Sequence, residues 1–188
     1  MKCITSDPRH LLGIYLNDHL AGAGAGISLL KRMTRAHRGS GAGPRLALLT
    51  EEDTEDRDSL REVMTSVDVP VNHVRSLLGV AAAQAGRLKG NGRVLARSPL
   101  SDVLELEAIR MGVEGKKELW RTLHTLARTE PGLDAEAMGR LLARAERQAG
   151  VLEALRLAAV DRALRGGSPQ VLATPHRSGR RAAKAGWA

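Results

Sequence analysis

Seven carboxylates fall within sixteen consecutive positions of the chain, in the stretch LTEEDTEDRDSLREVM at residues 49–64. Carboxylates at this density can bind metal ions, or they can form the hydrated outer face of a helix. On a helical projection, only Asp53 and Asp56 fall among apolar residues such as Leu49 and Leu60. The chemical question therefore narrows to two carboxylates, three residues apart on one helix face.

Four long helices are predicted to position these groups. The chain is rich in Leu, Ala and Arg, and only 2% of its residues are aromatic, which favours an all-α fold. Cap residues at Asp7, Ser98 and Asp134, the first two followed by proline, mark three of the helix starts. The predicted helices span residues 8–37, 44–67, about 99–128 and 135–165.

The spacing of these helices predicts two antiparallel pairs joined by a long crossover, which contains a short helix at about residues 72–86. An up-down pair, a long crossover and a second pair is the connectivity of a ferritin-like four-helix bundle. Residues 1–165 are predicted to form this bundle domain. Residues 166–188 are predicted to form a basic, flexible tail.

The first predicted helix contains the glycine-rich run AGAGAG at residues 21–26. Each glycine weakens a helix by up to about 1 kcal/mol relative to alanine. We expect packing to compensate, because Gly22 and Gly26 lie about one turn apart and would let another backbone approach closely.

Several segments of the chain also resemble a known family. The segments LGIYLNDHLAGAGAGISLLKR, EEDTEDRDSLREVM, GRLKGNGRVLARSPLSDVLELE and GVEGKKELWRTL are similar to an uncharacterised bacterial family of ferritin-like bundles. The resemblance covers about residues 11–163. It implies the fold and no particular activity.

A metal site is one interpretation of the inward-facing polar residues. The residues with suitable ligand chemistry for iron or manganese are His19, Asp53, Asp56 and Glu105. Ferritin-like di-iron sites use two Glu-x-x-His pairs, yet none of the six histidines lies three residues after a glutamate. With a rise of 1.5 Å per residue, His19 is expected roughly 27 Å from the first interhelical turn and Glu105 roughly 8 Å, too far apart to share a metal.

The interpretation that we favour is a buried polar network without a metal. Its predicted members are Asp53, Asp56, Glu105, Gln148 and Arg156. A buried carboxylate needs a partner, and the planar guanidinium group suits carboxylates. We therefore expect Arg156 to pair with Glu105, and we expect no cofactor.

The net charge of +8 is distributed unevenly along the chain. Residues 20–50 contain five basic residues and no acid, whereas residues 51–68 carry a net charge of −6. The basic segments and the tail indicate non-specific binding of polyanions, including nucleic acid, as a further alternative. The chain contains only Tyr15 and two tryptophans, so few aromatic side chains are present to stack on bases.

The remaining sequence features bear on location and assembly. Cys3 is the only cysteine, and no run of eighteen apolar residues occurs, so we expect neither a disulfide nor a membrane-spanning helix. The expected location is the cytoplasm. The apolar arc around Trp120 is wide, which a homo-oligomer interface or cover by the crossover would explain.

The expected function is thus a non-catalytic structural or interaction protein. The alternatives are an iron or manganese oxidase or storage protein with a degenerate carboxylate site, and a polyanion-binding accessory protein.

Overall fold

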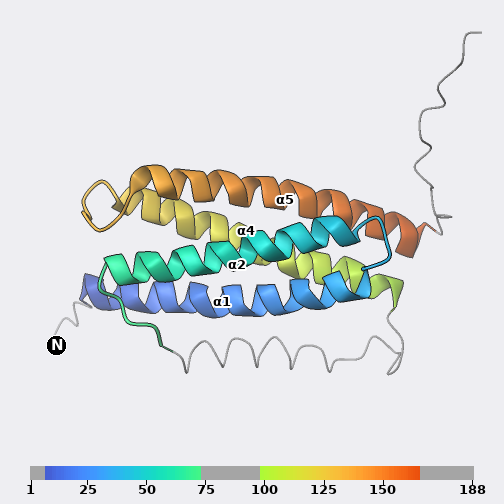
Figure 1. The fold of residues 1–188 in the computed structure, drawn as a ribbon, viewed down its shortest axis with the longest axis horizontal. Coiled ribbons are helices and arrows are strands. Elements are labelled where there is room, and N and C mark those ends of the chain that lie inside the picture. The colour runs from blue at the N-terminus through green and yellow to red at the C-terminus, as the bar shows by residue number, and fades with distance from the viewer. Residues whose placement is uncertain (1–6, 73–97, 166–188) are drawn as a thin grey trace, which may run out of the picture.

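The computed structural model describes residues 7–72 and 98–165, and these residues form four helices and no strand. The helices are α1 (Pro8–Ala36), α2 (Gly43–Ser66), α4 (Pro99–Leu126) and α5 (Ala135–Leu164), shown in Figure 1. The prediction of an all-α fold is confirmed, and each helix end lies within two residues of its predicted position. Residues 73–86 of the predicted short helix and the predicted tail lie outside the described residues.

Three helices begin at the predicted caps. The side chains of Asp7, Ser98 and Asp134 each accept a hydrogen bond from the backbone N–H two residues later, at 3.1, 3.3 and 2.9 Å. Each bond satisfies a donor that has no partner within the helix. Proline follows Asp7 and Ser98, where its fixed φ angle suits the first helical position and its missing N–H costs nothing.

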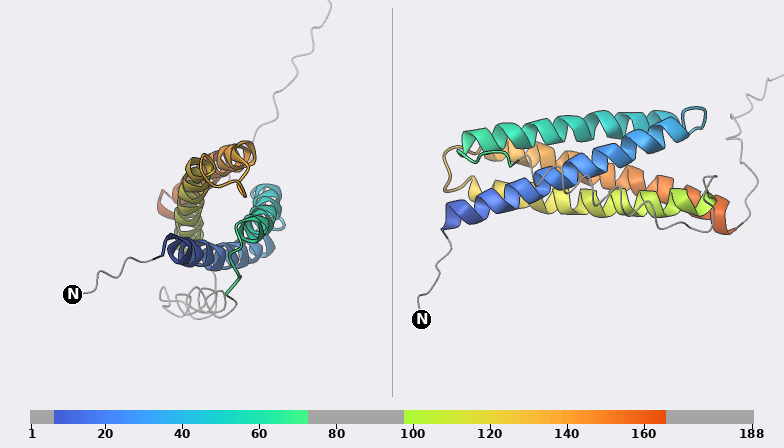
Figure 2. Two further views of the ribbon diagram at one scale, coloured as in Figure 1. Left: turned by 90° about the vertical axis from the view of Figure 1, so that its left-hand side faces the viewer. Right: turned by 90° about the horizontal axis from the view of Figure 1, so that it is seen from below.

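The helices form two antiparallel pairs, α1 with α2 and α4 with α5. Helix α1 also packs against α4, and α2 contacts α5 over a short stretch. Seen end-on, the two pairs enclose a common interior (Figure 2). Helices α2 and α4 run in the same direction, so the end of α2 and the start of α4 lie at opposite ends of the bundle (Figure 1).

The interior is filled by leucines, other aliphatic residues and Trp120, whose exposed fraction is 1%. Burial of a leucine or similar side chain contributes about 1.5–3 kcal/mol, so this cluster drives the association of the helices. The wide apolar arc of α4 contains both buried and exposed residues in the structure. Trp120 lies in the core, whereas Leu100, Leu104 and Met111 are exposed on the outer side of the helix.

The end of α2 is held by a specific backbone turn. Asp68 adopts a left-handed conformation with φ of 54°, and the Val69 N–H donates to the Met64 carbonyl at 2.8 Å. This arrangement satisfies carbonyl groups that the end of a helix leaves open. The α4–α5 turn packs on the same place, since a Cβ atom added at Gly132 would lie 2.4 Å from the Ser66 carbonyl oxygen.

The close backbone approach expected at Gly22 and Gly26 is not found among the described residues. A Cβ atom added at either position would meet nothing within 4 Å among the described residues, so no described backbone approaches them closely. Within the described part of the chain, no contact therefore offsets the cost of these two glycines to the helix.

We therefore predict that Gly22→Ala raises the free energy of unfolding by about 0.5–1 kcal/mol, because alanine restricts the unfolded chain and favours the helix. Urea unfolding followed by circular dichroism measures the change. Gly132→Ala is the matched control and should destabilise, because its Cβ would collide with the Ser66 carbonyl. If Gly22→Ala lowered the free energy of unfolding instead, the conclusion that Gly22 faces open space would be contradicted.

Candidate functional site

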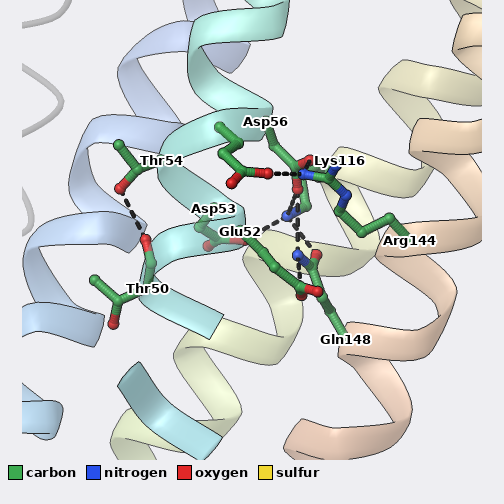
Figure 3. Close-up of polar contacts among 9 residues, drawn as sticks. Thr50, Glu52, Asp53, Thr54, Asp56, Lys116, Arg144 and Gln148 are labelled. Carbon is green, nitrogen blue, oxygen red and sulfur yellow. Dashed lines mark hydrogen bonds and ion pairs between the residues drawn. The ribbon is translucent and has the colours of Figure 1, made fainter. Parts of the chain in front are cut away.

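The most concentrated group of buried polar side chains surrounds Lys116 of α4 (Figure 3). The Lys116 Nζ atom donates hydrogen bonds to a carboxylate oxygen of Asp53, to Asp56 Oδ2 at 2.6 Å and to Gln148 Oε1 at 2.6 Å. All three donor positions of the ammonium group thus have an acceptor. Helices α2, α4 and α5 are joined through this one atom.

Further hydrogen bonds surround Lys116 and its three acceptors. The Gln148 amide nitrogen donates to Glu52 Oε2 at 3.0 Å and to Asp56 Oδ2 at 3.3 Å. Arg144 of α5 donates to Asp56 Oδ1 at 3.2 Å and to Glu55 at 2.8 Å. Both carboxylate oxygens of Asp56 therefore have hydrogen-bond donors, and the network reaches the surface through Glu55 and Arg144.

The centre of this network is nearly shielded from solvent. The exposed fractions are 2% for Asp56, 1% for Gln148 and 14% for the Lys116 side chain. Burial raises the pKa of Asp53 above its ordinary value of 3.8, and the negative charges of Asp56 and Glu52 add to this increase. The charge and hydrogen bond of Lys116 oppose the increase.

His19, a predicted metal ligand, lies far from this network. Helix α1 is aligned with α2 by the Thr34–Thr50 hydrogen bond of 3.1 Å. His19 is fifteen residues before Thr34 and so lies level with position 65 of α2, nine residues or about 14 Å beyond Asp56. Its ring contacts Tyr15, with centroids 4.6 Å apart, and burial lowers its pKa below 6.5 while Asp18 opposes this decrease.

The expected pair between Arg156 and Glu105 is wrong. Glu105 accepts a hydrogen bond from Arg32 of α1 at 2.6 Å, eleven residues or about 16 Å along α4 from Lys116. Arg156 instead binds Glu153 at 2.7 and 2.9 Å, one turn earlier on its own helix, and lies 3.7 Å from Glu107. Its long side chain extends to the surface between α4 and α5.

Of the predicted network, the structure thus brings together Asp53, Asp56 and Gln148. The prediction missed Lys116, although the sequence contains a signal for it. Lys116 lies three residues after Val113 and four before Trp120, and both are core residues, so helical periodicity places it on the buried face.

The chemistry of this donor set does not fit a di-metal centre. Its acidic ligands are two aspartates with a glutamate at the edge, and an ammonium group already lies between the aspartates. A metal ion near the same oxygens would meet the positive charges of Lys116 and Arg144. Within residues 7–72 and 98–165, no group of three or more His, Cys, Asp or Glu side chains is placed to hold a metal.

A second polar feature lies at the end of the bundle where α2 finishes. The side chain of the buried Asn17 accepts from the Asn72 backbone N–H at 2.6 Å and donates to the carbonyls of Pro70 and Gly13 at 3.1 and 2.9 Å. It fixes the segment after α2 on α1. A neighbouring cavity of about 500 Å³ is lined by three carboxylates, of Asp7, Asp68 and Glu130, together with Arg9, His10 and apolar residues.

Comparison of the chain with family models, curated proteins and solved structures found no match. Over the described part of the chain, no helix has the length and apolar character needed to cross a membrane.

Replacing the central cation should be costly. We predict that Lys116→Met lowers the free energy of unfolding by about 3–5 kcal/mol, because it leaves two buried aspartates without their shared partner. Chemical denaturation provides the measurement. The matched control is Lys117→Met, since Lys117 pairs with Glu114 at the helix surface and its removal should change stability by only about 0–1 kcal/mol.

Neutralising the aspartates gives a further control. Adding Asp53→Asn and Asp56→Asn to Lys116→Met removes the uncompensated charges, so part of the lost stability should return. Equal effects of Lys116→Met and Lys117→Met would show that the network does not hold the helices together.

The pKa of Asp53 gives an independent prediction. In the folded protein its titration, followed by carbon-13 NMR of the carboxyl group, should have a midpoint above 3.8, and Lys116→Met should raise that midpoint further. Folded Asp53 binds its proton more tightly than unfolded Asp53, so its contribution to the free energy of unfolding declines as the pH rises from 3.8 through the folded pKa. If the titration midpoint of Asp53 fell in Lys116→Met, the prediction would be wrong.

Proposed function

We propose that this protein is a ferritin-like helical bundle that acts as a non-catalytic structural or interaction protein. The observation that carries the proposal is the position of Lys116 Nζ, which donates to Asp53, Asp56 and Gln148 in the interior. Ferritin-like enzymes place metal ligands on the inward faces of the bundle helices. Here a side-chain ammonium supplies the positive charge.

The arrangement of the helices supports the ferritin-like part of the proposal. Two antiparallel pairs with α2 and α4 running in the same direction require a connection along the length of the bundle. A long crossover between two helix pairs distinguishes this topology from simple up-down-up-down bundles.

The state of the site supports a non-catalytic role. The Lys116 Nζ atom already donates to three side chains of the bundle, so its donor positions are occupied by Asp53, Asp56 and Gln148. Asp56 and Gln148 are almost fully buried, so a substrate has no direct access to the centre. The network therefore serves to hold α2, α4 and α5 in fixed relative positions.

Metal analysis separates this proposal from an iron or manganese oxidase or storage protein. Protein purified without chelators, and then incubated with Fe²⁺ or Mn²⁺ and desalted, should retain far less than one metal ion per chain by mass spectrometry of the elements. Lys116→Gln should retain more than the wild type, because the competing ammonium is gone.

The outcome in favour of the metalloprotein would be near-stoichiometric iron or manganese that is lost in Asp53→Ala and Asp56→Ala. Glu51→Ala is the control in the same acidic stretch, since Glu51 is exposed on the outer face of α2. Metal that is lost equally in Glu51→Ala would indicate adsorption to the acidic surface.

A further inference from the structure

Four basic side chains gather at the end of the bundle where α1 finishes and α2 begins. They are exposed and form no ion pair within the described residues: Lys31, Arg35, Arg38 and Arg45. Two lie on the last turns of α1, one in the turn, and one on the first turn of α2. We name this group the basic end.

Several acidic side chains at this end bind other cations, but Glu51, which the Thr34–Thr50 hydrogen bond places level with Met33, is exposed and forms no ion pair within the described residues. Arg32 binds Glu105 at 2.6 Å, Arg165 binds Asp161 at 3.0 Å, and His37 and Arg162 contact Asp102 at 3.1 and 4.0 Å. Glu51 can offset at most one of the four positive charges, so most of the charge of the basic end is left for a partner outside the bundle.

The opposite end of the bundle has a different charge balance. Around the start of α1, the end of α2 and the α4–α5 turn, the acids are Asp7, Glu62, Asp68, Glu118, Glu130, Asp134 and Glu136. They outnumber the arginines there, which are Arg9, Arg61, Arg121, Arg128 and Arg140. The bundle thus has a positive end and a nearly neutral one, and a large polyanion would be oriented by this difference.

We propose that the basic end binds the phosphate backbone of nucleic acid without sequence preference. Three of its four cations are arginines, whose guanidinium groups bind phosphate through two hydrogen bonds. Lys31 and Arg35 lie one helical turn apart, about 6 Å, so they can contact neighbouring phosphates of one strand.

The aromatic side chains of the described residues limit the mode of binding. Tyr15 is half-buried and Trp120 is buried, so the described residues offer no platform for base stacking. Backbone contacts alone give binding that depends on salt and not on sequence.

An anionic membrane surface is the competing partner. Leu48, Leu100 and Leu164 are exposed on helix segments at this end and could contact lipid. Leu100 belongs to an exposed row with Leu104 and Met111 on α4, and Leu164 to one with Leu157 on α5, whereas three of the four cations lie on α1 or in the α1–α2 turn. A peripheral membrane helix carries its basic and its apolar face on the same helix. Nucleic acid therefore fits the charges better.

The test is fluorescence anisotropy of a labelled DNA duplex titrated with the full chain between about 50 and 300 mM NaCl. The wild type should bind, with an affinity that falls steeply as salt rises. Replacing Lys31, Arg35, Arg38 and Arg45 by Gln together should weaken binding by about tenfold or more at low salt. It should also reduce the slope of log Kd against log salt by about 3–4, since each phosphate contact contributes about 0.9.

The matched control replaces the same number of cations at the other end. Arg9, Arg121, Arg128 and Arg140 changed to Gln give the same net charge, and binding should stay close to that of the wild type. Thermal unfolding of both variants verifies that they are folded. The proposal is overturned if the wild type does not bind at about 50 mM salt, or if both variants lose equal affinity. It is also overturned if replacing the basic end abolishes binding to phosphatidylserine vesicles but leaves DNA binding intact.

Discussion

The rest of the bundle depends on one buried charge interaction, the ammonium of Lys116 between Asp53 and Asp56. Helices α2 and α5 meet over only a short stretch, and the network lies there. Apolar packing holds each antiparallel pair together, but it is tolerant of small shifts along the helix axes. Charged hydrogen bonds tolerate no such shift, because a displacement of one turn would leave the aspartates against apolar side chains without a donor. The network therefore sets the register of the two pairs.

Most of the fold could be predicted from the sequence because its signals are local. Asp7, Ser98 and Asp134 cap the next turn of the chain, and apolar periodicity reports which side of a helix is buried. The separation of the acidic stretch into inner and outer carboxylates follows from the same periodicity. Asp56 is buried, whereas Glu51 and Glu55 are exposed.

The ion-pair partners could not be predicted in this way. A helical projection gives the direction of a side chain but neither its height relative to other helices nor its reach. Arg156 has several rotatable bonds and binds Glu153 one turn away, although its Cα lies near the apolar arc. The Arg156 side chain points away from the core, whereas the Lys116 side chain points from the edge of the core toward its centre. Glycine gives a similar lesson, since AGAGAG has the composition of a close helix contact, but Gly22 and Gly26 face open space among the described residues.

A covalently attached cation gives this site a different chemistry from a metal. A bound metal can leave, exchange ligands or change its oxidation state, whereas the charge of Lys116 stays in place while the bundle is folded. The remaining variable is the proton of Asp53, whose pKa is raised by burial and by its acidic neighbours and is lowered by Lys116. The ammonium thus holds three helices together and, through its charge, limits the increase in the Asp53 pKa that burial causes. Both effects act on the stability of the folded bundle.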